Sequence, residues 1–483
     1  MTAGLAPGPA DRLVADPDRL FPPDRTERAI ARELYADVRL LPIVSPHGHV
    51  DARVLADDLP FGDPAALLIA PDHYVTRMLH AYGEPLTALG HRDRVTGAEP
   101  AAPREVWRTF CEHWTAFRGT PTRHWLEAEL VELFDLDLVP GPDTADALFD
   151  ALADRLARPE FRPRAMLDRF GIEVLATTDD PADDLAAHAV LAADEAVTAR
   201  VLPTFRPDRY LDASAAGWEQ ALDRLGAVTG HDTGSYRGLL SALADRRAFF
   251  LAHGGTATDH GHPDAGCTPL EPDRAAALFD RLRAAGNAHP SDADVVAFRG
   301  HMLFEMARMS SEDGLVMQLH PGVLRNYDRA ALDAFGPDTG HDIPVATEFT
   351  RALRPILEAF GNHPRFRMVA FTVDETVWSR ELAPLAGYFP GFYVGVPWWF
   401  LDSPDTFRRF RAAVTDSAGF GKTSGFIDDT RAFCSIPARH DMARRLDAGF
   451  LARYVAEGRL RLDEAHDTAH DLAHDLPLRV FRL

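Results

Sequence analysis

The length, composition and charge of this 483-residue chain limit what it can be. With 46% hydrophobic and 26% charged residues, it has the composition of a globular protein large enough to bury an extensive core. The formal net charge of −22 disfavours nucleic acid and anionic lipid surfaces as partners, because both are negatively charged. An anionic small molecule is still allowed, since a few arginines can set the field inside a pocket.

Neither a membrane anchor nor an export signal is indicated. The segment 1–18 has no basic start followed by an apolar core, and no apolar run reaches the length of a membrane span. The three cysteines, Cys111, Cys267 and Cys434, are far apart and form no C-x-x-C pair, so neither a disulfide framework nor a zinc knuckle is predicted. We expect a cytoplasmic protein.

Short apolar runs that end in turn or polar residues predict buried parallel strands. In chain order these runs are 38–44, 173–176, 201–204, 248–252, 315–319, 367–372, 392–396 and 424–427. Amphipathic stretches lie between most of them and predict crossover helices, as at 181–199, 217–225 and 343–360. The alternation favours an α/β fold, and the number of runs fits a distorted (β/α)₈ TIM-type barrel.

One interval interrupts the alternation of strands and helices. Residues 50–170 carry helical periodicity, as at 104–117 and 124–134, without a convincing strand. We therefore predict a helical insertion at about 52–168, within a barrel that spans 36–483 and follows an N-terminal helical segment at 1–35.

Polar residues follow most of the runs, where catalytic groups of such a barrel lie. In chain order they are His47 and His49, Thr177 to Asp180, Arg206, Asp259 and His260, His320 and Arg325, and finally Asp429 and Arg431.

The pair His47 and His49 is the sharpest of these signals. Alternate residues of an extended segment point the same way, so both imidazoles can bind one metal ion. Asp429 could complete a ligand set suited to zinc, manganese or iron. Asp429 could instead cap a helix, and either it or its neighbour Asp428 could be the one that faces solvent.

Two arginines, Arg206 and Arg431, fit a clamp for a carboxylate, although ordinary surface salt bridges would explain them as well. His320 could be a core histidine, and Trp398 and Trp399 could simply fill the rim of a barrel.

Together these segments resemble the uronate isomerases, a branch of the metal-dependent amidohydrolase superfamily. The resemblance is carried by His47-Gly-His49, Asp72-His-Tyr74 followed by Arg77, Arg123-His-Trp125, Thr177-Thr-Asp-Asp-Pro181, Phe205-Arg-Pro-Asp208, Thr258-Asp-His-Gly261, Gln318-Leu-His320 with Leu324-Arg-Asn326, Trp398-Trp-Phe400 and Asp429-Thr-Arg431. These motifs occur in family order over most of the chain.

The resemblance implies an aldose–ketose isomerase with one divalent metal ion, often Zn²⁺, with Mn²⁺ or Fe²⁺ as alternatives. It implies a hexuronate as substrate, D-glucuronate or D-galacturonate, and a homo-oligomer. By residue, it assigns the metal to His47, His49 and Asp429, catalysis to Asp429, Tyr74, His73 and His320, and substrate binding to Arg206, Arg431, Arg325, Trp398, Asp259 and His260. Which of Asp429 and Tyr74 is the acid and which the base stays open.

The chain departs from the family pattern in two places. Ser45 stands where the family usually has Asp, which puts the support of the metal ligand His47 in doubt. The segment 435–440 carries an apparent extra residue. A metal-dependent hydrolase and a non-catalytic sugar-acid-binding relative are alternatives. For the hydrolase, no lysine is placed to be carboxylated between two metal ions, Lys422 being the only lysine in the chain.

Overall fold

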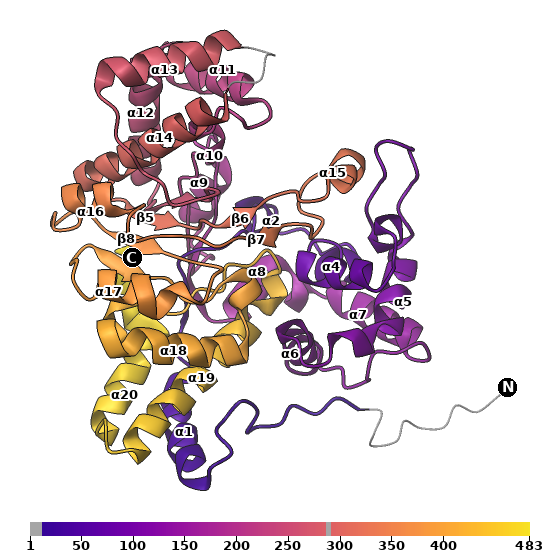
Figure 1. Cartoon of the computed structure of the whole chain (residues 1–483). Coiled ribbons are helices and arrows are strands. Elements are labelled where there is room, and N and C mark those ends of the chain that lie inside the picture. The colour runs from indigo at the N-terminus through magenta and orange to yellow at the C-terminus, as the bar shows by residue number, and fades with distance from the viewer. Residues whose placement is uncertain (1–11, 286–290) are drawn as a thin grey trace.

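Parallel strands form the centre of the molecule, which the computed structural model describes for residues 12–285 and 291–483 (Figure 1). One sheet has the order β1-β2-β3 and a second the order β4-β5-β8-β9. The strands are β1 (Ile43–Ser45), β2 (Ile172–Ala176), β3 (Arg200–Leu202), β4 (Ala257–His260), β5 (Val316–Leu319), β8 (Met368–Ala370) and β9 (Phe392–Val394). Every residue of β5 and β8 is buried, as expected for strands covered on both faces.

Single bridges extend the pairing beyond the two sheets. Phe205, just after β3, pairs with Thr258 of β4, and Val394 of β9 pairs with Thr423. Across the described residues these pairings do not amount to a closed ring of strands. The α/β class with parallel strands is confirmed, and six of the eight expected strands are present with shifted ends.

Helices lie around the sheets in the view of Figure 1. Before and within the expected insertion they are α1 (Arg25–Val38), α2 (Ala52–Asp57), α3 (Pro64–Leu68), α4 (His73–Ala81), α5 (Pro103–Glu112), α6 (Pro121–Ala128), α7 (Ala145–Leu156) and α8 (Pro163–Arg169). Beyond β2 they are α9 (Ala186–Ala193), α10 (Asp208–Leu211), α11 (Trp218–Thr229), α12 (Tyr236–Ala252), α13 (Pro272–Ala285), α14 (Asp292–Asp313), α15 (Arg329–Phe335), α16 (Arg354–Phe360), α17 (Ala383–Ala386), α18 (Pro404–Ala418), α19 (Ile436–Ala456), α20 (Leu462–His470) and α21 (Leu476–Phe481). Among the helices of residues 12–285 and 291–483, none combines the length and the apolar character that crossing a membrane requires.

Two of the strand predictions are wrong. The run 248–252 is the last turn of α12, and the strand follows at β4. A short apolar run is compatible with a buried strand and with the buried side of a helix, and here α12 continues through it. The run 424–427 is buried but forms no strand, and Gly425 within it has a φ of 72°; only Thr423 before it pairs with β9.

Element ends also differ from the predictions. Val38 closes α1, so the first strand begins only at Ile43. The expected helix at 343–360 starts as β7 (Ile343–Pro344), paired antiparallel with β6 (Val323–Leu324), and becomes helical only at α16. Proline supplies no donor to a helix interior, and this segment carries Pro344 before α16.

Helices α4 to α7 form a lobe on the right in Figure 1, and its buried side chains belong to one hydrophobic cluster with residues of β1, β2 and β3. Its centre is aromatic, with Trp107, Phe110, Trp114 and Phe117 almost fully buried. The Asp72 carboxylate caps α4 by accepting from the Tyr74 backbone N–H at 2.8 Å. This cap fixes the start of the helix that carries two of the expected site residues.

A buried ion pair joins the C-terminal helices. Arg411 of α18 donates to both carboxylate oxygens of Asp447 on α19, at 2.6 and 2.8 Å, and to the Thr423 hydroxyl at 3.2 Å. Both charged side chains are almost inaccessible to water. The pair therefore holds α18 and α19 against the segment that leads to Asp429.

We predict that Arg411→Met lowers the free energy of unfolding by about 3–5 kcal/mol, because Asp447 is left as an uncompensated buried charge. Arg461→Met, which removes an exposed pair with Asp463, is the control and should leave the urea midpoint almost unchanged. Equal midpoint shifts in the two variants would show that the buried pair has no special part in stability.

Candidate active site

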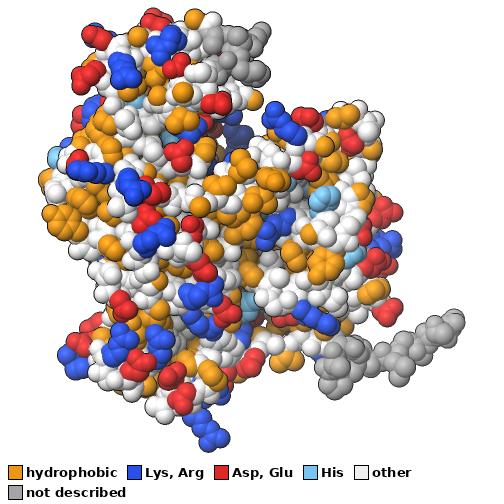
Figure 2. Space-filling view, viewed as in Figure 1, with side chains coloured by type: hydrophobic (Ala, Val, Ile, Leu, Met, Phe, Trp, Pro, Cys, Tyr) orange, Lys and Arg blue, Asp and Glu red, His pale blue; other side chains and the backbone are white. Residues whose placement is uncertain are grey.

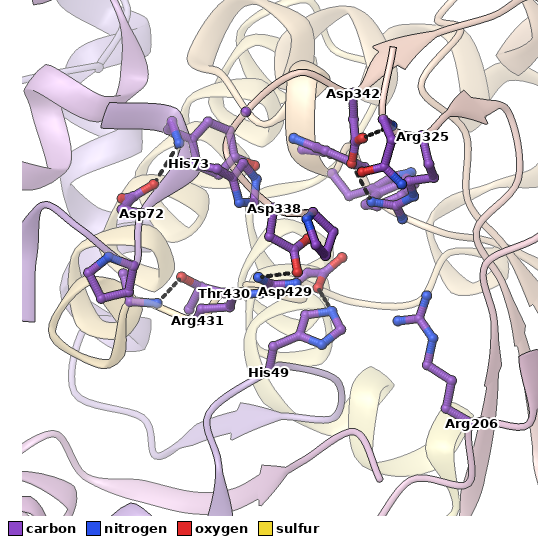
Figure 3. Close-up of a pocket in the computed structure, with 18 residues that line it drawn as sticks. His49, Asp72, His73, Arg206, Arg325, Asp338, Asp342, Asp429, Thr430 and Arg431 are labelled. Carbon is purple, nitrogen blue, oxygen red and sulfur yellow. Dashed lines mark hydrogen bonds and ion pairs between the residues drawn. The ribbon is translucent and has the colours of Figure 1, made fainter. Parts of the chain in front are cut away.

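A cavity of about 300 Å³ opens where the strand ends, the lobe of inserted helices and the segment around β6 and β7 meet (Figure 3). Its lining brings together residues far apart in the sequence, among them His49, His73, Tyr74, Arg206, Arg325, Asp338, Asp342, Trp398, Trp399, Asp429 and Arg431. Eight of these are expected site residues. The remaining three, Asp338, Asp342 and Trp399, were not assigned a role.

Two imidazoles and one carboxylate converge at the floor of this cavity. His47 and His49 follow β1 directly, and their Nε2 atoms lie 3.4 and 3.1 Å from Asp429 Oδ1. Asp429 adopts a left-handed backbone conformation with φ of 40°, which is costly for a non-glycine residue and directs its carboxylate at the histidines. The possibility that Asp429 faces solvent or caps a helix is therefore wrong.

The same three groups perturb one another's protonation. Burial would raise the pKa of Asp429, but the neighbouring His47 and His49 hold it well below its ordinary value. Burial would lower the pKa of His47, but the carboxylates of Asp429 and Asp259 outweigh burial and raise it. Asp429 is thus a carboxylate at neutral pH, and the three donor atoms form a nitrogen and oxygen set of the kind that binds zinc, manganese or iron.

A second group of charged and polar side chains, Asp259, His320 and Arg206, lies next to His47 and Asp429. Asp259 of β4 accepts from His320 Nδ1 at 2.7 Å and pairs with Arg206 Nη1 at 3.0 Å. His320 stacks on His47 with ring centroids 4.8 Å apart. Its Nε2 is buried, has no hydrogen-bond partner among the residues that the structure describes, and lies 4.0 Å from Asp429 Oδ2. His320 is therefore oriented by Asp259 and still has one nitrogen free to act.

The support of His47 is incomplete, as the sequence suggested. The Ser45 hydroxyl and His47 Nδ1 are both buried, and neither has a hydrogen-bond partner within residues 12–285 and 291–483. A family Asp at position 45 could accept from the imidazole, whereas Ser45 does not reach it.

The arginines line the cavity and are not ordinary surface residues. Arg431 pairs with Asp338 at 3.2 Å, and Arg325 pairs with Asp342 at 3.0 Å while its guanidinium stacks over Trp399 at 4.5 Å. Arg206, Arg325 and Arg431 approach the cavity from three separate segments, as Figure 3 shows. They can therefore bind one carboxylate from several sides.

Aromatic side chains form part of the cavity wall. His73 stacks on Tyr74 at 4.9 Å, and Trp398 packs edge-on against His320 at 4.7 Å. Burial and the nearby Arg431 lower the pKa of His73 to about 3, so this imidazole is neutral at physiological pH. Burial raises the pKa of Tyr74, which is therefore protonated.

His260 is placed differently from the other expected residues. It follows Asp259 in β4, so its side chain points to the other face of the strand. Like His47, Asp259 and His320 it does not line the cavity, but those three contact Asp429 or Arg206, which do. On its own face of the strand, His260 clusters with His262 and Asp208. Asp208 already accepts from Arg206 Nε and the Gly261 N–H, both at 2.9 Å.

The segment with the apparent extra residue supports the loop of Asp429. It begins α19, from which Arg439 donates to Asp402 at 2.6 Å and His440 Nε2 lies 3.0 Å from Asp428 Oδ2. Asp428 is 2% exposed, so the alternative in which it faces solvent is also wrong.

Asp338 and Asp342 were hardly predictable as site residues from the sequence. They lie in an irregular segment between α15 and β7, where Gly336 and Gly340 adopt positive φ. The only signal was a Gly-Pro-Asp-Thr-Gly turn that follows no strand.

A model of the family described as glucuronate isomerase matches residues 25–479 of the chain. The chain is 50% identical over 471 residues to the uronate isomerase of Cutibacterium acnes, covering 98% of this chain and 99% of the relative. It is 52% identical to the uronate isomerase of Rhizorhabdus wittichii, covering 97% and 98%. Among solved structures, glucuronate isomerase from Caulobacter crescentus superposes with a TM-score of 0.94 at 45% identity, covering 98% and 97%. The uronate isomerase from Thermotoga maritima gives 0.89 at 28% identity, covering 97% and 99%.

His260 predicts a pH dependence of stability. Burial lowers its pKa to about 3 from an ordinary 6.5, so between these values the folded protein binds fewer protons than the unfolded chain. The contribution of neutral His260 to the free energy of unfolding is therefore complete above pH 6.5 and is lost as the pH falls from 6.5 towards about 3. We predict that the thermal midpoint of His260→Asn falls less steeply than that of the wild type on acidification. Parallel curves would contradict this origin of acid sensitivity.

Proposed function

The chain belongs to the glucuronate isomerase family, and we propose that it interconverts a hexuronate with its ketose, D-glucuronate with D-fructuronate or D-galacturonate with D-tagaturonate. The observation that carries this proposal is the convergence of His47, His49 and Asp429 beside three cavity arginines. A sugar acid has a carbonyl end, which His47, His49 and Asp429 would face, and a carboxylate end, which the arginines would bind.

We also place the two parallel sheets in one distorted (β/α)₈ barrel. The bridges at Phe205 and at Thr423 support this, because they link the sheets and add an eighth position. The His49 N–H donates to the Thr430 carbonyl at 3.0 Å, which would join the last segment to the first. In this proposal the barrel spans 36–483 and the helices at about 52–168 are inserted into it.

A divalent metal ion, with Zn²⁺ as our proposal and Mn²⁺ or Fe²⁺ as alternatives, would be held by His47, His49 and Asp429. The donor set and its spacing fit such an ion, since one ligand atom from each residue lies within 4.8 Å of the others. When bound, the ion would polarise substrate oxygens as a Lewis acid.

Isomerisation moves a proton between adjacent carbons through an enediol, so it needs a base at carbon and an acid at oxygen. We assign Asp429 as the base, because its pKa is held well below the ordinary value and the group is ionised. Tyr74, whose pKa burial raises, keeps its proton and donates it to the carbonyl oxygen. Neutral His73 and the oriented His320 hold the substrate hydroxyls.

The arginines and Trp398 position the substrate. Arg206, Arg325 and Arg431 bind the distant carboxylate and so align the carbon that loses its proton with Asp429. Asp259 positions Arg206 and His320 through its contacts with both. His260 lies beside Asp208, which pairs with Arg206, so its proposed contribution to substrate binding is indirect.

The hydrolase alternative has no support from lysine. Lys422 Nζ donates to the backbone carbonyls of Phe389 and Pro390 at 3.0 Å and is not a cavity residue. We keep isomerisation as the one proposed reaction.

The cellular setting completes the proposal. Cys111, Cys267 and Cys434 are buried free thiols, which suits a cytoplasmic enzyme. A homo-oligomer would cover Leu324, Tyr327 and Ile343, which lie exposed around the β6–β7 hairpin. Acidic and basic side chains are interspersed over the face seen in Figure 2, without a continuous basic patch for nucleic acid.

We predict that Asp429→Asn lowers kcat by about 10²–10⁴-fold, because the amide cannot accept the proton. Ketose formation from D-glucuronate and D-galacturonate is followed with and without chelator. Asp333→Asn, on the exposed side of α15, makes the same charge change outside the cavity and is the control. Near-wild-type turnover by Asp429→Asn would remove Asp429 from the role of base.

A further inference from the structure

The ion pair between Asp338 and Arg431 stands at the junction of two cavities. Both residues line the 300 Å³ active-site cavity and a neighbouring cavity of about 680 Å³. Their side chains keep 46% and 38% of their surface exposed, and Figure 3 shows the pair at the centre of the site. Arg431 therefore faces the substrate space with one donor group already engaged.

The backbone holds Asp338 in this position. Asp338 has a φ of 65°, in the left-handed region, and glycines with φ of 88° and 93° stand on either side of it at 336 and 340. Gly340 packs so closely on Arg77 that an added Cβ would lie 2.5 Å from the Arg77 Cβ. A strained, packed aspartate whose carboxylate meets a cavity arginine is a built feature of the site.

Asp338 differs from the other aspartates beside cavity arginines. Asp259 is fully buried and joins Arg206 to His320. Asp342 is also buried and accepts the Asn326 N–H at 2.6 Å. Asp338 is half exposed, and the structure gives its carboxylate no partner other than Arg431 among the described residues. Its charge is thus available to act on an incoming anion.

We propose that Asp338 sets the affinity of the site for sugar acids by competing with the substrate carboxylate for the Arg431 guanidinium. The proposal rests on the proposed function, in which Arg431 binds that carboxylate. A substrate carboxylate at Arg431 comes close to the fixed negative charge of Asp338, and the repulsion weakens binding of both substrate and product. Asp338 is in this sense a residue that determines affinity and charge selectivity, and it takes no part in proton transfer.

The test is Asp338→Asn, which keeps the shape of the side chain and removes its charge, and asparagine tolerates the left-handed region. In metal-loaded enzyme, we expect the Kd for D-glucuronate, measured by calorimetry, to fall by about three- to tenfold, the scale of one partly screened charge. Asp333→Asn changes the net charge equally on the exposed side of α15 and should leave Kd unchanged. A Kd for Asp338→Asn that is unchanged or higher overturns the proposal and makes Asp338 a support for Arg431.

A double mutant isolates the competition. In an Arg431→Met background, Asp338→Asn should tighten binding far less, because the two carboxylates no longer share a guanidinium. An equal tightening in both backgrounds would overturn competition at Arg431. Failure of the proposed function is separate from either result, since it would be seen as binding of D-glucuronate by the wild type without formation of the ketose.

Discussion

Asp429 is a buried carboxylate held between the imidazoles of His47 and His49, and the positions of the other groups in the site depend on it. A carboxylate at 6% exposure is costly unless positive or metal partners compensate it. Here the compensation comes from two residues that β1 delivers almost four hundred positions earlier in the chain. The fold must therefore bring the segment after β1 against the segment that carries Asp429 for this charge to be tolerated.

The electrostatic pattern separates acid from base within one small space. Partner groups lower the pKa of Asp429, whereas burial against aromatic rings raises that of Tyr74. At neutral pH Asp429 is therefore ionised and Tyr74 protonated, so one can accept a proton and the other donate one. The helices between β1 and β2 contribute to this, because Asp72 caps α4 and α4 carries Tyr74 into the cavity that Asp429 lines.

Much of the site could be predicted from the sequence because its residues sit beside strand ends. His47, Arg206 and Asp429 follow buried runs or their equivalents, and polar groups after such runs gather at one end of a parallel sheet. The helices between β1 and β2 were also predictable, since helical periodicity without a convincing strand extends over this interval. The fourth strand was misplaced because the run 248–252 lies in α12, and a local apolar pattern cannot distinguish the two states.

Other features of the site depend on long-range packing that no local pattern records. Asp338 lies on an irregular segment whose place is fixed by Arg77 of the inserted lobe. The ion pairs of Asp259 with Arg206 and His320 form because β4 lies next to β5 and to the segment after β3. That strand order cannot be read from a local sequence pattern.

Crystals soaked in ZnCl₂ and measured at the zinc edge test the central claim most directly. The account predicts one strong anomalous peak within about 2.0–2.2 Å of the Nε2 atoms of His47 and His49 and of a carboxylate oxygen of Asp429. A peak elsewhere, or Asp429 turned away from the two imidazoles, would contradict it.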